Sequence, residues 1–312
     1  MRARIRPEEA LLAGYGIALV AIMATTGHWT FTSTMHRRFI DVFLVLAALV
    51  LARDFVRARR EDRSPWQSLR RALPPAAQVI RDFTPFLIAL VFYETLHDLT
   101  PLIRHDVVDD VLIGIDRRVL GVDAAVWMGR FGSPGLTHFM VFCYLSYFFA
   151  PAILASLIYW SGRRQLFRDF LVSLCVVTLL GYTGYLLVPA VGPYLYQAEL
   201  FPDRLPGGGL KNTESMIQTI DALKGYARDC FPSLHTAHTT VVLTFAWRWS
   251  RLAFLVYLPI GLGLYVSTIY LRMHYAVDVA AGFVVATIAV MVGPRLERWW
   301  YRDAVPAIMR AS

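Results

Sequence analysis

Long apolar runs separated by short charged loops constrain this chain more than any other feature of its sequence. Of the 312 residues, 56% are hydrophobic and only 17% are charged, whereas a typical soluble domain carries about 25% charged residues. Several runs approach the ~20 residues that an α-helix needs to cross a bilayer. The sequence therefore predicts an all-α fold, a polytopic integral membrane helix bundle, and excludes a water-soluble domain.

We expect about eight transmembrane helices at these runs. Their approximate positions are 11–26, 39–51, 83–99, 136–159, 170–188, 234–247, 252–270 and 275–292. The basic segment 53–82 separates the first two helices from the other six, and is either a surface helix on anionic lipid or a plain connector. In the loop 102–132, alternating apolar and acidic residues predict a helix at the membrane interface.

Arginines gather in every second connection of this arrangement, which predicts the orientation of the chain. They occupy 53–81, 163–168, 248–251 and 295–302. With the N-terminus in the cytoplasm, all four segments fall on the cytoplasmic side, as the positive-inside rule requires. The formal net charge of +8 is therefore assigned to orientation and not to nucleic-acid binding. The expected location is the bacterial inner membrane, with both termini cytoplasmic.

The cysteines and histidines give no sign of a metal site. Cys143, Cys175 and Cys230 lack the spacing of a metal motif or of a disulfide framework. His235 and His238 share a helix face, but no third ligand stands at a spacing that suits zinc. We therefore expect no bound metal and no other cofactor.

Two polar clusters mark the ends of the apolar hairpin within 226–278. His235 begins one apolar run, and Arg272, His274 and Asp278 follow the next. If both runs cross the bilayer, the two clusters emerge together on the extracytoplasmic side. Ionisable side chains at membrane depth are costly and usually functional. The sequence therefore predicts one composite site, although a buried polar pair that only joins helices would also fit His274 and Asp278.

The composition of this site suits phosphoryl transfer. An aspartate four residues after a histidine can accept one ring N–H and leave the other nitrogen as base or nucleophile. Pro232 and Ser233 are expected to begin and cap a helix whose free N–H groups attract an anion, so Ser233 is assigned to the substrate phosphate. Arg272 is assigned to the same phosphate because its planar guanidinium can donate two parallel hydrogen bonds to it. It could instead anchor a helix end at the lipid headgroups. Lys224 and Arg228 are weaker phosphate-binding candidates.

At these segments the chain resembles a known family. Phe-Pro-Ser-Leu-His-Thr at 231–236 and His-Tyr-Ala-Val-Asp-Val at 274–279 resemble the second and third signatures of the type 2 phosphatidic acid phosphatase superfamily. They are most similar to the branch with inositol phosphorylceramide synthases and sphingomyelin synthases. The segments 188–194 and 116–121 resemble weaker elements of that branch.

The resemblance covers about 83–292 and implies a six-helix catalytic core. It implies that His274 is a nucleophile that forms a phosphohistidine, that Asp278 orients it, and that His235 is the general acid. The first phosphatase signature, Lys-x6-Arg-Pro, is absent, and 267–268 is Ser-Thr where Ser-Arg is usual. These departures favour the transferase-like branch.

Three domains and one leading function are therefore expected. Residues 1–82 hold two helices and a basic linker, 83–294 the core, and 295–312 a cytoplasmic tail. The leading function is a lipid phosphotransferase that moves a phospho-headgroup between lipids, with a phospholipid or lipid-phosphate substrate and no nucleic-acid partner. One alternative is a lipid phosphate phosphohydrolase. An alternative from another class is a proton-coupled transporter or flippase, which would place ionisable residues near the bilayer midplane.

Overall fold

The computed structural model describes residues 5–29, 34–61, 64–201, 205–206 and 228–302, and the side chains of these ranges except 34–39. Every regular element in these ranges is a helix, which confirms the expected all-α class. In chain order they are α1 (Pro7–Thr26), α2 (Thr34–Arg59), α3 (Pro65–Ile103), α4 (Asp109–Leu120), α5 (Ala124–Gly129), α6 (Pro134–Trp160), α7 (Arg164–Leu187), α8 (Pro193–Tyr196), the 3₁₀ turn η1 (Ala198–Leu200), α10 (Leu234–Trp249), α11 (Arg251–Tyr270) and α12 (Ala276–Tyr301). The chain divides into two compact units, Met1–Leu99 and Thr100–Ser312.

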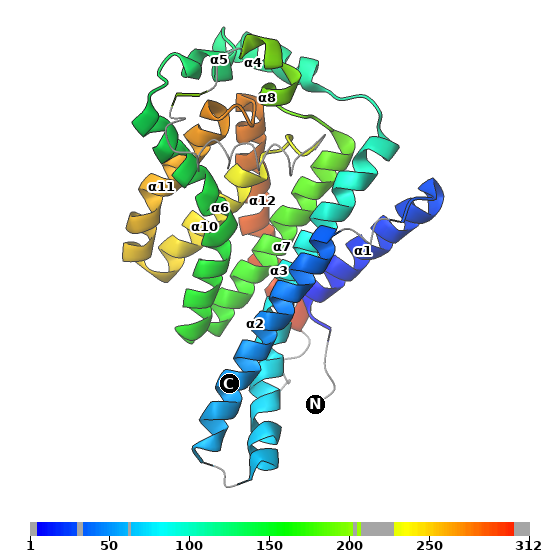
Figure 1. Cartoon of the computed structure of the whole chain (residues 1–312), viewed down its shortest axis with the longest axis vertical. Coiled ribbons are helices and arrows are strands. Elements are labelled where there is room, and N and C mark those ends of the chain that lie inside the picture. The colour runs from blue at the N-terminus through cyan, green and yellow to red at the C-terminus, as the bar shows by residue number, and fades with distance from the viewer. Residues whose placement is uncertain (1–4, 30–33, 62–63, 202–204, 207–227, 303–312) are drawn as a thin grey trace. The chain divides into compact units, whose positions relative to one another are not determined.

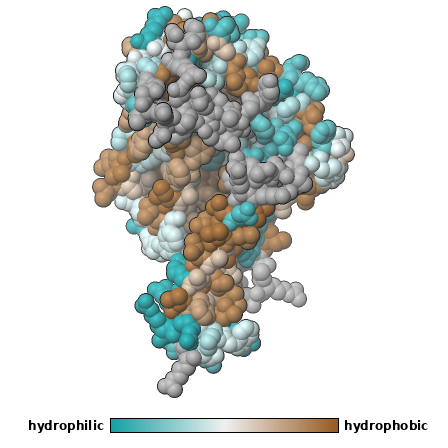
Figure 2. All heavy atoms as spheres, viewed as in Figure 1, coloured by the Kyte–Doolittle hydropathy of each residue, from teal (hydrophilic) through white to brown (hydrophobic). Residues whose placement is uncertain are grey.

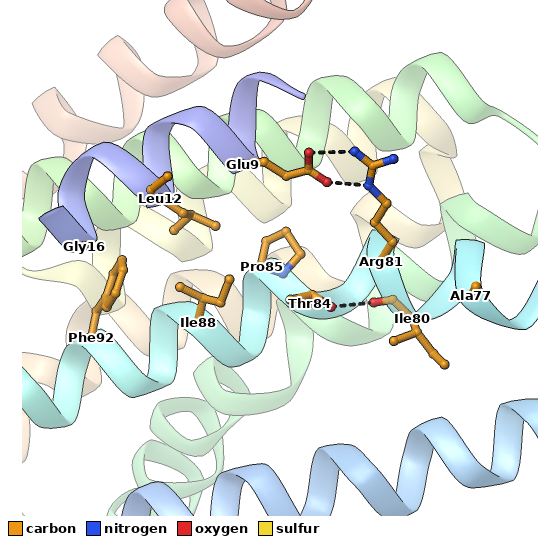
Figure 3. A pocket seen from close by; sticks show the side chains of 11 residues that line it. Glu9, Leu12, Gly16, Ala77, Ile80, Arg81, Thr84, Pro85, Ile88 and Phe92 are labelled. Carbon is orange, nitrogen blue, oxygen red and sulfur yellow. Dashed lines mark hydrogen bonds and ion pairs between the residues drawn. The ribbon is translucent and has the colours of Figure 1, made fainter. Parts of the chain in front are cut away.

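In the first unit, ion pairs join the start of α1 to the middle of α3. Arg6 Nη1 lies 2.6 Å from Asp82 Oδ1, and Arg81 donates two hydrogen bonds to the carboxylate of Glu9. The Glu9–Arg81 pair lies at the polar end of an otherwise apolar pocket between α1 and α3, which also contains Phe92 (Figure 3). Carboxylates in the first turn of α1 also suit the positive end of its helix dipole.

The segment 53–82, for which the sequence leaves a surface helix and a plain connector both open, is mostly helical. Helix α2 continues to Arg59, and α3 begins at Pro65 and runs unbroken through the predicted linker to Ile103. Proline is tolerated at a helix start because its missing N–H would have no intrahelical partner there. Ala72 and Ala76, one turn apart, are both buried. Packing along this face stabilises the helix through Pro74 and Pro75.

The second unit is a bundle with α10 at its centre (Figure 1). Helix α10 contacts α6, α7, α11 and α12, and α12 also packs along α7. The short helices α4, α5 and α8 lie together at one end of this bundle, where α4 contacts α12. The same end holds the turn between α11 and α12, so the expected interfacial helix and the two polar clusters come together there.

All eight runs expected to cross the membrane are helical, and six of the described helices are long and apolar enough to span a bilayer. These six are α1, α3, α6, α7, α11 and α12. Helix α10 has 16 residues, or about 24 Å, which is shorter than the hydrocarbon layer. Broad apolar patches cover the face of the molecule in Figure 2, and many large apolar side chains are exposed. The chain is an integral membrane protein.

Small residues let the start of α10 sit tightly between α7 and α12. A Cβ atom on Gly184 of α7 would overlap the ring of Pro232. A Cβ atom on Gly282 of α12 would lie 2.6 Å from the carbonyl oxygen of Ser233. Lipid tails are as apolar as these helices, so close packing at small residues is a main source of helix association in membranes. The two glycines therefore fix the position of His235 relative to α12.

Candidate functional site

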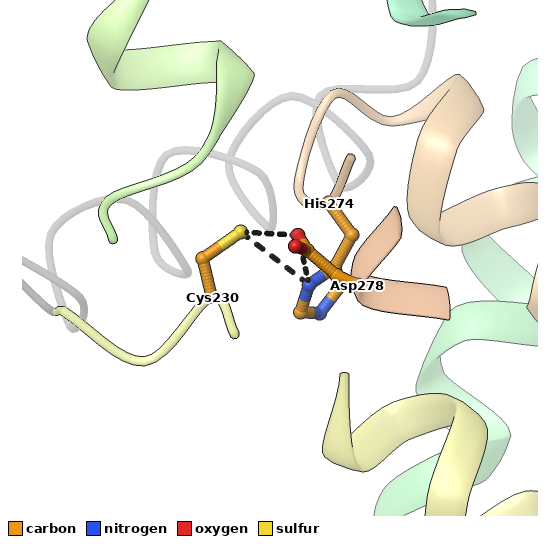
Figure 4. A group of neighbouring side chains, drawn as sticks. All are labelled: Cys230, His274 and Asp278. Carbon is orange, nitrogen blue, oxygen red and sulfur yellow. Dashed lines mark hydrogen bonds and ion pairs between the residues drawn. The ribbon is translucent and has the colours of Figure 1, made fainter. Parts of the chain in front are cut away.

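His274 and Asp278 form the buried centre of the site (Figure 4). His274 Nδ1 lies 3.4 Å from Asp278 Oδ2, and the two side chains are 2% and 0% exposed. His274 lies in the turn before α12, which begins only at Ala276, and Asp278 lies in the first turn of that helix. The turn is held by the N–H groups of Met273 and His274, which both donate to the carbonyl of Thr268. The turn that carries His274 therefore packs against the first turn of α12, which carries Asp278.

His235 completes a continuous row of three side chains. It lies in the first turn of α10, is half-buried, and its Nδ1 is 3.3 Å from His274 Nε2. Asp278 thus lies against one ring nitrogen of His274, and His235 against the other. The structure brings together the two polar clusters that the sequence separates by an apolar hairpin.

Two tyrosines of α6 enclose the His235 ring. The ring centroids of Tyr144 and Tyr147 lie 4.4 Å and 4.2 Å from that of His235. Aromatic rings at this separation pack against one another, so the two tyrosines hold the imidazole in place. Sequence reasoning missed both residues, because aromatic side chains are common throughout membrane helices and nothing local marks these two.

Ser233 caps α10 from a fully buried position. Its Oγ accepts hydrogen bonds from the N–H and the hydroxyl of Thr236, at 3.3 Å and 3.2 Å. Its own N–H donates to the carbonyl of Asp278 at 3.1 Å, so the α10 start is joined to α12. The capping expectation is confirmed, whereas Pro232 lies before the helix and not in its first turn.

The start of α12 is already occupied by carboxylates, so it is not an open anion site. Asp116 of α4 accepts hydrogen bonds from the N–H groups of Ala276 and Val277, at 2.7 Å and 2.9 Å. Asp278 accepts the N–H of Tyr275 at 2.8 Å. These are the free donors that every helix start leaves. The N–H groups at the α12 start are therefore already bonded within the protein.

Asp109 is the second buried carboxylate that α4 contributes. It accepts hydrogen bonds from Gly192 N at 2.9 Å, Val191 N at 3.1 Å and the Tyr275 hydroxyl at 2.8 Å. Gly192 has φ +88°, which glycine adopts without the steric cost of a Cβ. Burial raises the pKa of Asp109 and, likewise, that of Asp116. Sequence reasoning noted Asp116 only as part of a weak resemblance and missed Asp109.

Asp116→Asn is expected to lower both stability and turnover. The amide has one acceptor oxygen, so one buried N–H at the start of α12 loses its partner, which costs about 1–3 kcal/mol in unfolding free energy. Thermal unfolding in detergent measures this loss. The matched control is Asp123→Asn, which breaks an ion pair with the exposed Arg117 and should cost at most about 1 kcal/mol. Equal unfolding midpoints for the two variants would contradict the capping role of Asp116.

Of the three basic residues expected to bind the substrate phosphate, two lie in the described part of the chain. Arg272 is buried, with φ +64°, and its guanidinium lies 4.2 Å from the ring centroid of Phe201. Arg228 donates a hydrogen bond to the carbonyl of Arg104. Lys224 lies outside the described residues. Arg272 thus lies two residues before His274 in the buried part of the site, while Arg228 is engaged with main chain.

Cys230 is a member of the cluster that sequence reasoning missed. Its thiol donates a hydrogen bond to Asp278 Oδ2 at 2.8 Å and lies 3.5 Å from His274 Nδ1. Its N–H donates to the carbonyl of Ala190 at 3.0 Å. Burial, followed by the nearby Asp278 carboxylate, raises the pKa of the thiol well above its usual value. No spacing rule relates Cys230 to residues 44 and 48 positions away.

The arrangement can support nucleophilic catalysis at phosphorus. A carboxylate that accepts the Nδ1–H of a histidine fixes the tautomer that presents the Nε2 lone pair. The imidazole of His235, adjacent to that nitrogen, is placed to give a proton to a leaving oxygen. A buried arginine supplies positive charge for a phosphate.

Two comparisons with known proteins found similar sequences. The sequence model of the PAP2 superfamily matches residues 111–292. A phosphoinositol dihydroceramide synthase of Bacteroides thetaiotaomicron is 28% identical over 152 residues, which is 45% of this chain and 49% of that protein. The chain therefore matches about half the length of that relative. No solved structure matches the chain.

Proposed function

The chain belongs to the PAP2 superfamily, and from this membership we propose that it is a membrane enzyme that moves a phospho-headgroup between lipids. The observation that carries the proposal is the row of His235, His274 and Asp278, with contacts of 3.3 Å and 3.4 Å. A proton-coupled transporter or flippase, the alternative from another class, gains no support from the superfamily match.

In the first half-reaction, His274 Nε2 attacks the phosphorus of the donor lipid. The P–N bond forms as the bond from phosphorus to the leaving lipid oxygen breaks, and His235 gives that oxygen its proton. Asp278 stabilises the positive charge that develops on the His274 ring, as in other histidine–carboxylate pairs. The donor phosphate must enter between the two imidazoles, so their direct contact lengthens when substrate binds.

In the second half-reaction, an acceptor hydroxyl resolves the phosphohistidine. His235, now neutral, takes the hydroxyl proton as the oxygen attacks phosphorus, and the P–N bond breaks to restore His274. If the acceptor is a lipid alcohol, the enzyme is a phosphotransferase. If the donor is instead a lipid phosphate and water takes the place of the alcohol, the same residues release inorganic phosphate and act as a lipid phosphate phosphohydrolase, the second candidate function.

The proposed substrates follow from the curated relative. Its name describes synthesis of a phosphoinositol dihydroceramide. We therefore propose an inositol phospholipid as donor and a ceramide-type alcohol as acceptor. Both tails would stay in the bilayer while the headgroup reaches the end of the bundle that holds α4, α5 and α8.

We propose that this end of the bundle faces the extracytoplasmic side of a bacterial inner membrane. The support is the sequence: Arg163, Arg164 and Arg168, near the α6–α7 connection, and Arg248 and Arg251, near the α10–α11 connection, lie at the other ends of these helices. Positive residues are retained in the cytoplasm. Both chain termini are then cytoplasmic.

The proposal is tested with purified wild type and His274→Ala in detergent–lipid micelles. Donor lipids carry a label in the headgroup or the phosphate, and ceramide, dihydroceramide or diacylglycerol is added as acceptor. We expect a new labelled lipid that requires a ceramide-type acceptor and is absent with the variant. Phosphate-labelled phosphatidic acid is assayed in parallel, and free phosphate released from it without acceptor would identify the phosphohydrolase instead. Equal activity of wild type and variant would contradict both functions.

Arg272→Lys is expected to raise the KM for the donor lipid about tenfold, because lysine keeps the charge but loses the bidentate fork. Both residues have a Cβ, so the strain of φ +64° is the same in the two proteins. The measurement is KM and kcat with increasing mole fractions of donor in the micelle. An unchanged KM would remove Arg272 from the phosphate site.

A further inference from the structure

We propose that Cys230, His274 and Asp278 form an inhibitory binding site for Zn²⁺. The proposal rests on the proposed function for its inhibitory effect, but the binding itself follows from the three side chains. Each of them offers a different ligand atom that zinc accepts: a thiolate sulfur, an imidazole nitrogen and a carboxylate oxygen.

The geometry of the three ligand atoms is close to that of a zinc site. Cys230 Sγ to His274 Nδ1 is 3.5 Å, and His274 Nδ1 to Asp278 Oδ2 is 3.4 Å. Bond lengths of about 2.0–2.3 Å in a tetrahedron place neighbouring ligand atoms about 3.3–3.6 Å apart. Only the distance from Cys230 Sγ to Asp278 Oδ2, 2.8 Å, must lengthen, because the S–H proton now occupies that contact.

A second observation is that the Asp278 carboxylate has fewer hydrogen-bond donors than its burial requires. Asp278 Oδ1 is fully buried and has no hydrogen-bond partner among the described residues. A buried carboxylate oxygen without a donor is unfavourable. Both carboxylate oxygens lie near the thiol in Figure 4. Oδ2, 3.4 Å from His274 Nδ1, is the oxygen placed to bind the ion, and no hydrogen bond to Oδ1 is lost when the carboxylate turns toward it.

Charge and ligand type favour zinc over magnesium or calcium. When Zn²⁺ binds, the thiol proton leaves to solvent and the S–Zn bond replaces the S–H bond. The ion then faces one thiolate and one carboxylate, so the buried group is neutral overall. Magnesium and calcium prefer oxygen ligands, whereas thiolate and imidazole select softer ions such as zinc and cadmium.

Metal binding at Nδ1 would stop the reaction at its nucleophile. A neutral imidazole carries one N–H, so coordination of Nδ1 requires the proton to be on Nε2. The Nε2 lone pair is then absent, and Asp278 is withdrawn from its orienting role. Because the metal lies on the side of the ring away from the phosphate, we expect kcat to fall while KM stays unchanged.

The test measures binding and inhibition separately on the full-length protein. Cobalt(II) serves as a spectroscopic substitute, since a bound thiolate gives a charge-transfer absorption band. We expect this band with wild type and with the control Cys175→Ser, and its loss in Cys230→Ser. Turnover of a labelled donor lipid is then titrated with Zn²⁺ and, in parallel, with Mg²⁺. We expect Zn²⁺ inhibition that EDTA reverses, no effect of Mg²⁺, and at least tenfold weaker Zn²⁺ inhibition in Cys230→Ser relative to its own metal-free activity.

Several outcomes would overturn the proposal. One is a wild-type cobalt spectrum without a thiolate band, which needs no variant to interpret. Another is equal Zn²⁺ sensitivity of wild type and Cys230→Ser, checked with Cys230→Ala if the serine variant unfolds. A thiolate band in a protein without lipid turnover would support the metal site while contradicting the proposed function, so the two failures are distinguishable.

Discussion

His274→Ala is expected to lower the kcat of lipid turnover by at least about 10³-fold. The imidazole is the proposed covalent carrier of the phospho-headgroup, and a methyl group offers no lone pair to phosphorus. Its Nε2 is the ring nitrogen directed at His235, 3.3 Å away, while Nδ1 is held by Asp278. The measurement is the initial rate of labelled lipid product from purified protein in micelles.

The matched control for this variant is His238→Gln. His238 is also buried and lies one turn after His235, but its two nitrogens contact Thr178 Oγ1 at 2.8 Å and the carbonyl of Leu234 at 3.0 Å. Its loss should lower thermal stability and leave most of kcat. If His274→Ala kept more than about a tenth of wild-type kcat, a nucleophilic role for His274 would be contradicted.

Asp278→Asn is expected to lower kcat by about 10²- to 10⁴-fold with little change in KM. The Tyr275 N–H and His274 Nδ1 both face the same carboxylate atom, Oδ2, at 2.8 Å and 3.4 Å. An asparagine that keeps its oxygen there has no negative charge to stabilise the His274 ring, and one that turns its NH₂ there also loses the Tyr275 N–H. A donor at that position favours the tautomer with the proton on Nε2, which removes the nucleophilic lone pair. The measurement is the rate of the first burst of released diacylglycerol, compared between the variant and wild type.

A stability control separates this effect from misfolding. Asp116→Asn weakens the same helix start, because Asp116 accepts the N–H groups of Ala276 and Val277. It leaves the Asp278 carboxylate in contact with His274. We expect Asp278→Asn to lose far more kcat than Asp116→Asn at a similar unfolding midpoint. Similar losses of kcat in the two variants would indicate that Asp278 acts only as a helix cap.

The sequence predicted the pairing of the two polar clusters because the apolar hairpin between them has a simple geometry. Two adjacent membrane helices must return the chain to the same side, so His235 and His274 meet whatever the details of the loops. For 53–82 the sequence leaves a surface helix and a plain connector equally open. Prolines at 65, 74 and 75 are typical of places where a helix ends. In the structure, packing along buried Ala72 and Ala76 stabilises one continuous helix through positions 74 and 75.

The surroundings of the site depend on contacts that no local pattern records. Asp109 and Asp116 lie on a short helix about 160 residues before the α12 start that they stabilise. Tyr144 and Tyr147 reach His235 from α6, and Cys230 reaches Asp278 from a loop. Each of these contacts is set by how helices pack, and buried carboxylates and thiols are recognised only when their partners are known. The meeting of His235, His274 and Asp278 was therefore predictable, while the residues that surround and position them were not.

The most direct measurement is the isolation of the covalent intermediate. Wild-type protein is mixed with a donor lipid labelled at the headgroup phosphorus, without acceptor, and quenched in alkali, where a phosphohistidine is stable. Peptide mass spectrometry then locates the label. We predict an acid-labile phospho-headgroup on the peptide that contains His274, lost when a ceramide-type acceptor is added before the quench. A label on another residue, or turnover by a protein that never carries one, would contradict the proposed mechanism.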